Sequence, residues 1–275
     1  MKKEVIVQKN PKSPISEIFR TLRTNIQFIN SKKSLKTLLI TSTLPGEGKS
    51  WVSANLAVTF AEAGKKVLLI DADMRKGRQH TIFGVNNDCG LSNLLSGVDR
   101  SGRAETIDIS KYVQATEVQN LFVISKGDTP PNPSELLASD TTLGMLTELE
   151  SIFDLIILDG PPSLIVTDAL IISRLVDSTI IVVEYNNTKK DNLAKIKRDI
   201  ENVGGKIAGV VINKIPKQGN KYESTYYYSS ETRMTNIDKR RGDYRQLERK
   251  KNNATAERKQ EILEEINQYI NKDRK

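Results

Sequence analysis

The stretch Thr41-Ser-Thr-Leu-Pro-Gly-Glu-Gly-Lys-Ser50 decides the fold of this 275-residue chain. It follows the apolar run 38–40 and leads into a helix-like stretch at 51–62. A strand, a glycine-bearing turn ending in Gly-Lys-Ser and a helix form a loop that binds phosphate through backbone N–H groups and the helix N-terminus. Lys49 would place a positive charge on the β- and γ-phosphates, and the Ser50 hydroxyl could ligate Mg²⁺. We therefore predict a nucleotide site here.

One position departs from the usual G-x-x-x-x-G-K-[ST] pattern of such loops. Thr43 stands where the pattern has its first glycine. Gly46 and Gly48 remain, and we expect them to supply the backbone freedom that the turn needs. The position of Trp51 at the helix start favours packing over stacking on a base. The residues assigned to the nucleotide site in this segment are Gly46, Glu47, Gly48, Lys49, Ser50 and Trp51.

Two further apolar runs end in aspartates. Residues 67–70 lead into Asp71 and Asp73, and residues 155–158 lead into Asp159. Ligands of an open parallel sheet bind at the carboxyl ends of the strands, so these acids can converge on the metal and phosphates of the loop. An acid in such a place is otherwise a turn residue or a helix cap. Three of them beside a phosphate loop favour a shared site.

Helix and strand patterns alternate along most of the chain. Strands are predicted at 37–41, 66–71, 121–125, 155–159, 178–184 and 206–213. Helices are predicted at 15–29, 51–63, 91–95, 133–150, 167–175 and 188–203. This order predicts an α/β fold of the P-loop NTPase type, with a mostly parallel central sheet and helices on both faces. After Lys214 the pattern stops, and we expect a flexible C-terminal tail.

Composition restricts the class of protein. With 37% apolar residues, the chain can bury a sizeable core. The single cysteine, Cys89, excludes an internal disulfide and suits a reducing compartment. No apolar run approaches the roughly 20 residues of a membrane span, and residues 1–13 lack the hydrophobic region of a signal peptide. We therefore expect a cytoplasmic chain without a membrane span of its own.

The formal net charge of +8 is unevenly distributed. Residues 231–275 hold 13 Lys/Arg and 9 Asp/Glu, a net of +4, which leaves +4 for the other 230 residues. Because the body of the chain is only mildly basic, we expect no nucleic-acid partner.

Half of the chain's eight tyrosines fall within seven consecutive positions: Tyr222, Tyr226, Tyr227 and Tyr228. One interpretation is an exposed, β-prone strand, since tyrosine favours strands. The other is that these tyrosines are substrates, because they are tethered to a nucleotide-dependent phosphotransfer site.

At these motifs the chain resembles the bacterial tyrosine kinases (BY-kinases). It is similar to their split type, in which a cytoplasmic kinase works with a separate transmembrane adaptor in capsule or exopolysaccharide production. Residues 45–50 resemble the family's Walker A motif, 68–75 its Walker A′ motif and 156–162 its Walker B motif. Glu17, Arg20 and Arg23 match its E-x-x-R-x-x-R helix, predicted at 14–30. The resemblance covers about residues 1–230.

The resemblance implies an ATP- and Mg²⁺-dependent protein-tyrosine kinase that autophosphorylates its tyrosine cluster. Lys49 and Ser50 would then hold the phosphates and Mg²⁺, and Asp73 and Asp159 would organise the metal. Asp71 would orient the tyrosine hydroxyl or accept its proton. Asn213 lies where related P-loop ATPases contact the base.

The resemblance also implies partners. A transmembrane adaptor of the polysaccharide co-polymerase type would recruit the kinase to the inner face of the membrane and activate it through a cytoplasmic tail. A tyrosine phosphatase would reverse the modification. The helix with Glu17, Arg20 and Arg23 would build a homo-oligomeric ring, although a solvated charged face is the other interpretation of this i, i+3 spacing.

Two other functions fit the same loop. A ParA/MinD-like ATPase would control positioning or partitioning, but that class commonly has lysine where Leu44 stands, and no tyrosine cluster is expected in it. A nucleotide-gated scaffold would have assembly as its only output. For the kinase, the domains are predicted at 1–216 for the P-loop tyrosine kinase domain, 217–231 for the tyrosine-cluster tail and 232–275 for a basic helical extension of unknown role.

Overall fold

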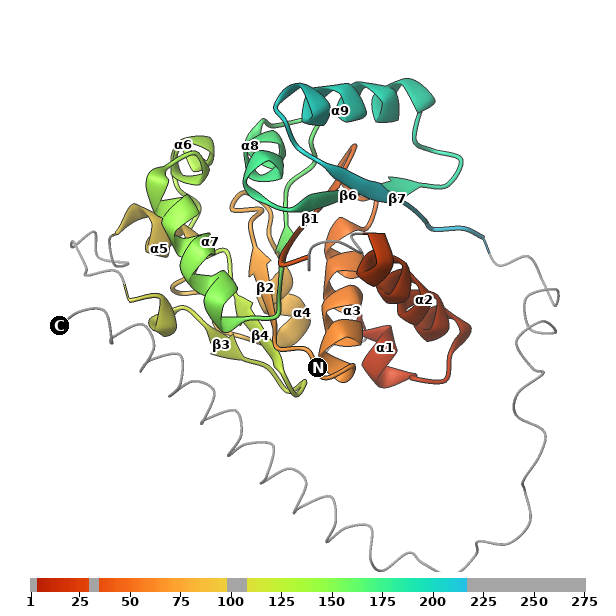
Figure 1. The fold of residues 1–275 in the computed structure, drawn as a ribbon, viewed down its shortest axis with the longest axis horizontal. Coiled ribbons are helices and arrows are strands. Elements are labelled where there is room, and N and C mark those ends of the chain that lie inside the picture. The colour runs from red at the N-terminus through yellow and green to blue at the C-terminus, as the bar shows by residue number, and fades with distance from the viewer. Residues whose placement is uncertain (1–3, 30–34, 98–107, 217–275) are drawn as a thin grey trace, which may run out of the picture. The chain divides into compact units, whose positions relative to one another are not determined.

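The structure is a computed structural model that describes residues 4–29, 35–97 and 108–216. The chain divides into two units, Met1–Ile215 and Pro216–Lys275. The tyrosine cluster of the predicted tail and the predicted helical extension at 232–275 lie outside the described residues. The first unit is an α/β structure built around one sheet (Figure 1).

Seven strands of the described residues form this sheet in the order β3-β4-β2-β5-β1-β6-β7. Neighbouring strands are parallel, except that β3 pairs with β4 in the antiparallel direction. The strands are β1 (Thr37–Ser42), β2 (Val67–Asp71), β3 (Gln114–Ala115), β4 (Leu121–Ile124), β5 (Leu155–Asp159), β6 (Ser178–Glu184) and β7 (Ile207–Asn213). The predicted parallel sheet is therefore confirmed.

The central strands are buried on both faces, which explains their continuous apolar sequences. Every residue of β1, β2, β4 and β5 is buried. The register places Asp71 of β2 directly beside Asp159 of β5, and Asp159 beside Ile40 of β1. The chain order changes direction at β1, so the loop after β1 lies at the switch point where parallel sheets bind ligands.

Helices cover both faces of the sheet (Figure 1). On one face α3 (Lys49–Glu62) is buried along almost its whole length, because α1 (Ile6–Lys9) and α2 (Pro14–Ile29) pack on its outer side. The short α4 (Gln79–Phe83) joins the same core. The other elements are α5 (Leu91–Ser96), a 3₁₀ turn at Ile109–Lys111, α6 (Pro133–Leu137), α7 (Asp140–Ile152), α8 (Asp168–Leu175) and α9 (Lys190–Asn202).

The prediction of one helix at 133–150 is wrong, because the structure has α6 and α7 in its place. Ser139 adopts extended backbone angles (φ −74°, ψ 155°), and its hydroxyl donates to the Leu136 carbonyl, as does that of Thr142. Asp140 then lies in the first turn of α7, where an acid is favourable. The short elements α1, α4 and β3 were not predicted, because two to five residues are too few to show the apolar periodicity of a helix or a strand.

Candidate active site

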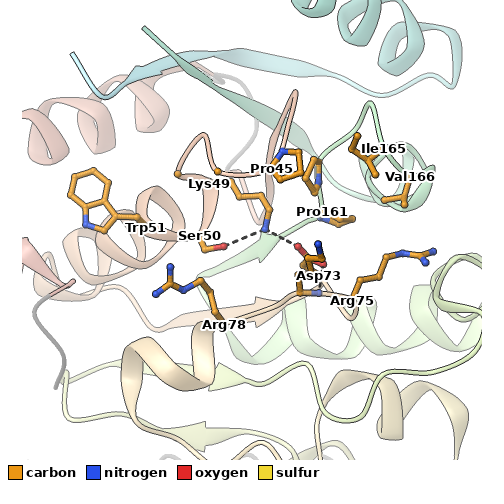
Figure 2. A pocket seen from close by; sticks show the side chains of 14 residues that line it. Pro45, Lys49, Ser50, Trp51, Asp73, Arg75, Arg78, Pro161, Ile165 and Val166 are labelled. Carbon is orange, nitrogen blue, oxygen red and sulfur yellow. Dashed lines mark hydrogen bonds and ion pairs between the residues drawn. The ribbon is translucent and has the colours of Figure 1, made fainter. Parts of the chain in front are cut away.

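A cavity of about 310 Å³ opens at the carboxyl edge of the sheet (Figure 2). The phosphate loop and the start of α3 form one wall. The turn after β2 forms the second wall, with Asp73, Arg75 and Arg78, and the loop after β5 forms the third, with Pro161 and Ile165. Three loops that are distant in the sequence thus meet at one site.

The two glycines of the loop have left-handed backbones. The φ angle is +87° at Gly46 and +97° at Gly48, as expected for the turn that compensates for Thr43. Gly48 also has no room for a side chain, because a Cβ would lie 2.1 Å from Nδ2 of Asn213. Since α3 begins at Lys49, its first N–H groups lack helical partners and can face an anion in the cavity.

Glu47 shapes the loop from inside. Its buried carboxylate accepts hydrogen bonds from the Thr43 backbone N–H (2.7 Å), the Thr43 hydroxyl (2.7 Å) and the Leu44 backbone N–H (2.9 Å). The Thr188 hydroxyl, just before α9, donates to the same carboxylate. The Glu47 side chain therefore holds the loop in shape. Thr43, which stands where the usual pattern has a glycine, donates two of the hydrogen bonds to Glu47.

Lys49 lies at the centre of the polar groups (Figure 2). Its Nζ is 2.9 Å from Oδ2 of Asp73, 3.7 Å from Oδ1 of Asp159 and 3.2 Å from the Ser50 hydroxyl. Burial acts to lower the pKa of Lys49, but the carboxylates of Asp159, Asp73 and Asp71 outweigh it, and the pKa is raised. The side chain is therefore a fixed positive charge at the head of the cavity.

Asp71 lies beneath the cavity. Its Oδ2 accepts the Gln79 backbone N–H at 2.9 Å, and its buried Oδ1 has no hydrogen-bond partner among the residues that the structure describes. A Cβ at Gly77 would lie 2.2 Å from Oδ1, so the turn after β2 covers this carboxyl group. Burial and, secondly, the charge of Asp159 raise the pKa of Asp71 well above its usual value. Asp73 lines the cavity, whereas Asp71 does not.

We expect Asp71→Asn to stabilise the nucleotide-free protein at pH 8. Because the pKa of Asp71 is raised in the folded state, the wild type loses stability as the pH rises from the unfolded value of about 4 through the folded value. If the gain is about 1 kcal/mol, the melting temperature at pH 8 should rise by about 2 to 4 °C, and the difference should vanish below about pH 3, where Asp71 is protonated in both states. The matched control, Asp191→Asn on the exposed surface of α9, should show no such effect. A lower melting temperature than wild type at pH 8 would contradict this account.

Two contacts at the site were not predicted. The guanidinium of Arg75 binds the buried Asp168 through both carboxylate oxygens, at 3.0 and 3.2 Å, and Ser134 donates to the same carboxylate. This pair ties the turn after β2 to the start of α8. The Gln79 amide contacts Asp159. Arg75 ends the segment 68–75 that resembles the Walker A′ motif, but Asp168 follows it by 93 positions, and no local pattern links the two residues.

Trp51 and Asn213 lie at the margin of the phosphate loop. The Trp51 ring meets the Phe19 ring of α2 edge-on, with centroids 5.2 Å apart, which is a packing contact, although Trp51 also lines the cavity. Asn213 donates from Nδ2 to the Glu47 carbonyl at 2.9 Å. The end of β7 is thereby joined to the loop.

Glu17, Arg20 and Arg23 lie on α2, outside the cavity. Arg20 pairs with Glu17 and donates to the Pro11 carbonyl at 2.9 Å. Arg23 reaches across to α3, where it donates to the Thr59 carbonyl at 3.1 Å. Arg23 therefore already has a role within its own chain.

These features define a P-loop nucleotide-binding protein: a phosphate loop after β1 and acids after β2 and β5 of a parallel sheet. A family model described as "AAA domain" matches residues 35–209. The chain is 44% identical over 222 residues to the putative tyrosine-protein kinase CapB of Staphylococcus aureus, which covers 81% of this chain and 92% of CapB. The chain belongs to the bacterial tyrosine kinases.

Two further comparisons support the family. The crystal structure of the chimerical protein CapA2B2 superposes with a TM-score of 0.72 at 40% identity, covering 79% of this chain and 92% of that one. The tyrosine-protein kinase wzc of Salmonella typhimurium is 36% identical over 229 residues, which are 83% of this chain but 31% of wzc. The kinase unit is thus part of a longer chain in wzc.

The ParA/MinD-like alternative is more distant. The cell division ATPase MinD of Pyrococcus furiosus superposes with a TM-score of 0.55 at 24% identity, which shows a shared fold alone. CapA2B2 superposes on this chain with a higher TM-score and a higher sequence identity than MinD, and CapB is also more similar in sequence.

Proposed function

We propose that this chain transfers the γ-phosphate of ATP to tyrosine hydroxyls, and that its own cluster, Tyr222, Tyr226, Tyr227 and Tyr228, is an acceptor. The observation that carries the proposal is the Lys49 ammonium, held at the head of α3 between Ser50, Asp73 and Asp159. In this position it would neutralise charge on the transferred phosphate. The names of the relatives, above all CapB, support a role in the synthesis and export of capsular or extracellular polysaccharide.

ATP would enter with its phosphates over the backbone of Gly46 and Gly48 and the N-terminus of α3. Lys49 would exchange its contact with Asp73 for the β- and γ-phosphates, because both are anionic partners within its reach. The base would lie toward Trp51 and Asn213, on the margin of the loop.

The residues present fit Mg²⁺. Ser50, Asp73 and Asp159 offer a hydroxyl and carboxylates, which are the hard oxygen donors that Mg²⁺ prefers. In the part of the chain that the structure describes, no group of three or more acidic, histidine or cysteine side chains could hold a metal. This suits an ion that is bound jointly with ATP phosphates, since Mg²⁺ usually keeps few protein ligands. Bound there, it would offset the charge that builds up on the phosphates.

In the transfer, the tyrosine oxygen forms a bond to Pγ, the bond from Pγ to the β-γ bridging oxygen breaks, and the phenolic proton leaves to a carboxylate. We assign this orienting or accepting role to Asp71. Asp71 can reach the hydroxyl only after the turn at 75–78 moves, because Gly77 covers it. Asp71→Asn should therefore bind nucleotide and lose most tyrosine transfer; a wild-type rate would show that the assignment is wrong.

The function is tested by incubating the purified protein with Mg-ATP and detecting phosphotyrosine. Steady phosphate release without phosphotyrosine would favour the positioning ATPase. Nucleotide binding without either product would favour the scaffold.

We infer a transmembrane adaptor as partner. In residues 4–29, 35–97 and 108–216, no helix has the length and apolar character needed to cross a bilayer. The matched residues make up 31% of wzc but 92% of CapB, so the unit occurs within a longer chain in one relative and nearly by itself in another. Ile165, which is 59% exposed at the cavity wall, and the exposed Leu44 in the phosphate loop offer an apolar rim that a partner could cover.

We expect the cytoplasmic tail of the adaptor to raise the autophosphorylation rate of the isolated chain by about tenfold or more, by closing this rim over bound ATP and shifting the population of the competent state. The measurement is the initial rate of phosphotyrosine formation with and without candidate tail peptides. A scrambled peptide is the control. A fast basal rate that no tail changes would contradict the proposal, unless residues 232–275 themselves act as the activator, which a chain ending at 231 would reveal.

We also infer a homo-oligomer, a ring formed through α2. Besides the exposed parts of Glu17 and Arg20, this helix presents Ile18 and Phe28, which are 56% and 75% exposed. Large apolar side chains at such exposure suit an interface between copies. A tyrosine phosphatase would then return the modified chain to the assembly.

A further inference from the structure

Gln79, the first residue of α4, is fully buried beneath the cavity. Its Nε2 donates to Oδ2 of Asp159 at 2.8 Å and to the Ser50 carbonyl at 3.0 Å. Its backbone N–H donates to Oδ2 of Asp71 at 2.9 Å. One residue thus contacts the phosphate loop and the acids of two neighbouring strands.

These contacts address an electrostatic problem. Asp71 and Asp159 are register partners on β2 and β5, and both are fully buried, so two carboxyl groups lie side by side away from water. Lys49 approaches Asp159 from the cavity side, at Oδ1. The two oxygens of Asp159 are held by different partners: Oδ1 by Lys49 and by the Ser53 hydroxyl, which donates to it at 3.3 Å, and Oδ2 by the amide of Gln79.

We propose that Gln79 is a positioning residue for the Mg-ATP site. Its amide fixes the rotation of the buried Asp159 carboxylate and ties it to the Ser50 peptide, so that Asp159 keeps a constant position relative to Ser50, which lines the cavity. Groups that orient metal ligands in this way contribute strongly to metal affinity. This inference rests on the proposed function, because it assigns Asp159 and Ser50 to bound Mg²⁺.

The side chain can be tested apart from the backbone contact to Asp71. Gln79→Met keeps the length and the apolar contacts but removes both amide donors, while the backbone N–H remains. Gln79→Asn keeps an amide on a side chain shorter by one methylene group, which cannot reach Asp159 and Ser50 together. The matched control is Ile82→Val, which removes one methyl group from the hydrophobic core on the buried side of the same helix.

The measurements are the Mg²⁺ dependence of ATP binding by calorimetry, the kinetics of phosphotyrosine formation and the melting temperature. For Gln79→Met and Gln79→Asn we expect the Mg²⁺ concentration at half-saturation to rise about 10- to 100-fold, and kcat to fall with little change in the KM for ATP. Ile82→Val should keep the wild-type Mg²⁺ dependence, even if its melting temperature falls as much as that of the Gln79 variants.

Equal Mg²⁺ dependence in Gln79→Met, Gln79→Asn and Ile82→Val would overturn the proposal and leave Gln79 as a packing residue. If one Gln79 variant fails to fold, the other decides. If the wild type forms no phosphotyrosine, the proposed kinase function fails, but the calorimetric Mg²⁺ dependence still tests Gln79.

Discussion

Replacing Lys49 with Met is expected to lower the autophosphorylation rate by about a hundred- to a thousandfold. The substitution removes the ammonium whose neighbours are Ser50, Asp73 and Asp159. A fixed donor at the site where charge develops contributes about this factor to enzymatic rates. The measurement is the initial rate of phosphotyrosine formation at saturating Mg-ATP.

A control must show that the lower rate of Lys49→Met comes from the lost ammonium group and not from a loss of folded protein. Lys65→Met removes one exposed lysine just beyond α3 and should keep the wild-type rate. Lys49→Met itself leaves Asp73 and Asp159 without their common cation, so its melting temperature at neutral pH should respond to added Mg²⁺ more than that of the wild type. A folded Lys49→Met protein with a rate within about threefold of wild type would contradict the role assigned to Lys49.

The second large effect is expected from mixing two defective chains. Lys49→Met transfers phosphate at least about a hundredfold more slowly than the wild type, and an active chain that ends at Pro216 has no tyrosine cluster. If transfer occurs between subunits, the mixture should phosphorylate the tyrosines of Lys49→Met much faster than Lys49→Met does alone. Tyr228 follows Pro216 by 12 residues, which extended span about 40 Å at roughly 3.3 Å each, enough to reach a neighbouring site.

This transfer should depend on the assembly through α2. Arg20→Ala is the cleaner test, because Arg23 also holds the Thr59 carbonyl of α3 and its loss would affect the fold. Light scattering should show a large assembly for Lys49→Met that is lost when Arg20→Ala is added, while Lys197→Ala on the exposed face of α9 should change nothing. Absence of labelling would exclude transfer between subunits, and a monomeric Lys49→Met at micromolar concentration would exclude the ring.

Phosphorylation should in turn weaken the assembly. Each phosphotyrosine adds about −1.5 to −2 charges, so four of them place roughly −6 to −8 on a short segment. Repulsion between neighbouring loaded segments should then separate the subunits. Unphosphorylated protein is therefore expected to be oligomeric and phosphorylated protein largely monomeric.

The sheet could be predicted because its strands are buried on both faces. For β5 and β6 the predicted and observed bounds coincide, since each contains a continuous apolar run, 155–158 and 180–183, with polar residues on both sides. The phosphate loop was readable for a similar reason: glycine, lysine and serine at fixed spacing have one geometric use after a strand. Placing Asp71 and Asp159 at one edge then required only the parallel direction of their strands.

The contacts that could not be predicted depend on the direction in which side chains point and on partners that are distant in the sequence. Glu47 turns inward because Thr188, 141 positions later, helps to bind it. Gln79 had no local signal, because its side-chain partner Asp159 lies 80 positions away on a strand that becomes its neighbour only in the folded sheet. The depth of Asp71 depends on Gly77 covering it, which the spacing of the acids does not reveal.

The most direct test of the central claim is mass spectrometry of the purified full chain after incubation with Mg-ATP, with Lys49→Met incubated in parallel. We predict phosphate on tyrosines of the cluster Tyr222, Tyr226, Tyr227 and Tyr228 in the wild type, and at least about a hundredfold less of it in the Lys49→Met sample at early times. Release of phosphate from ATP with all four tyrosines unmodified would contradict the account and identify the chain as an ATPase.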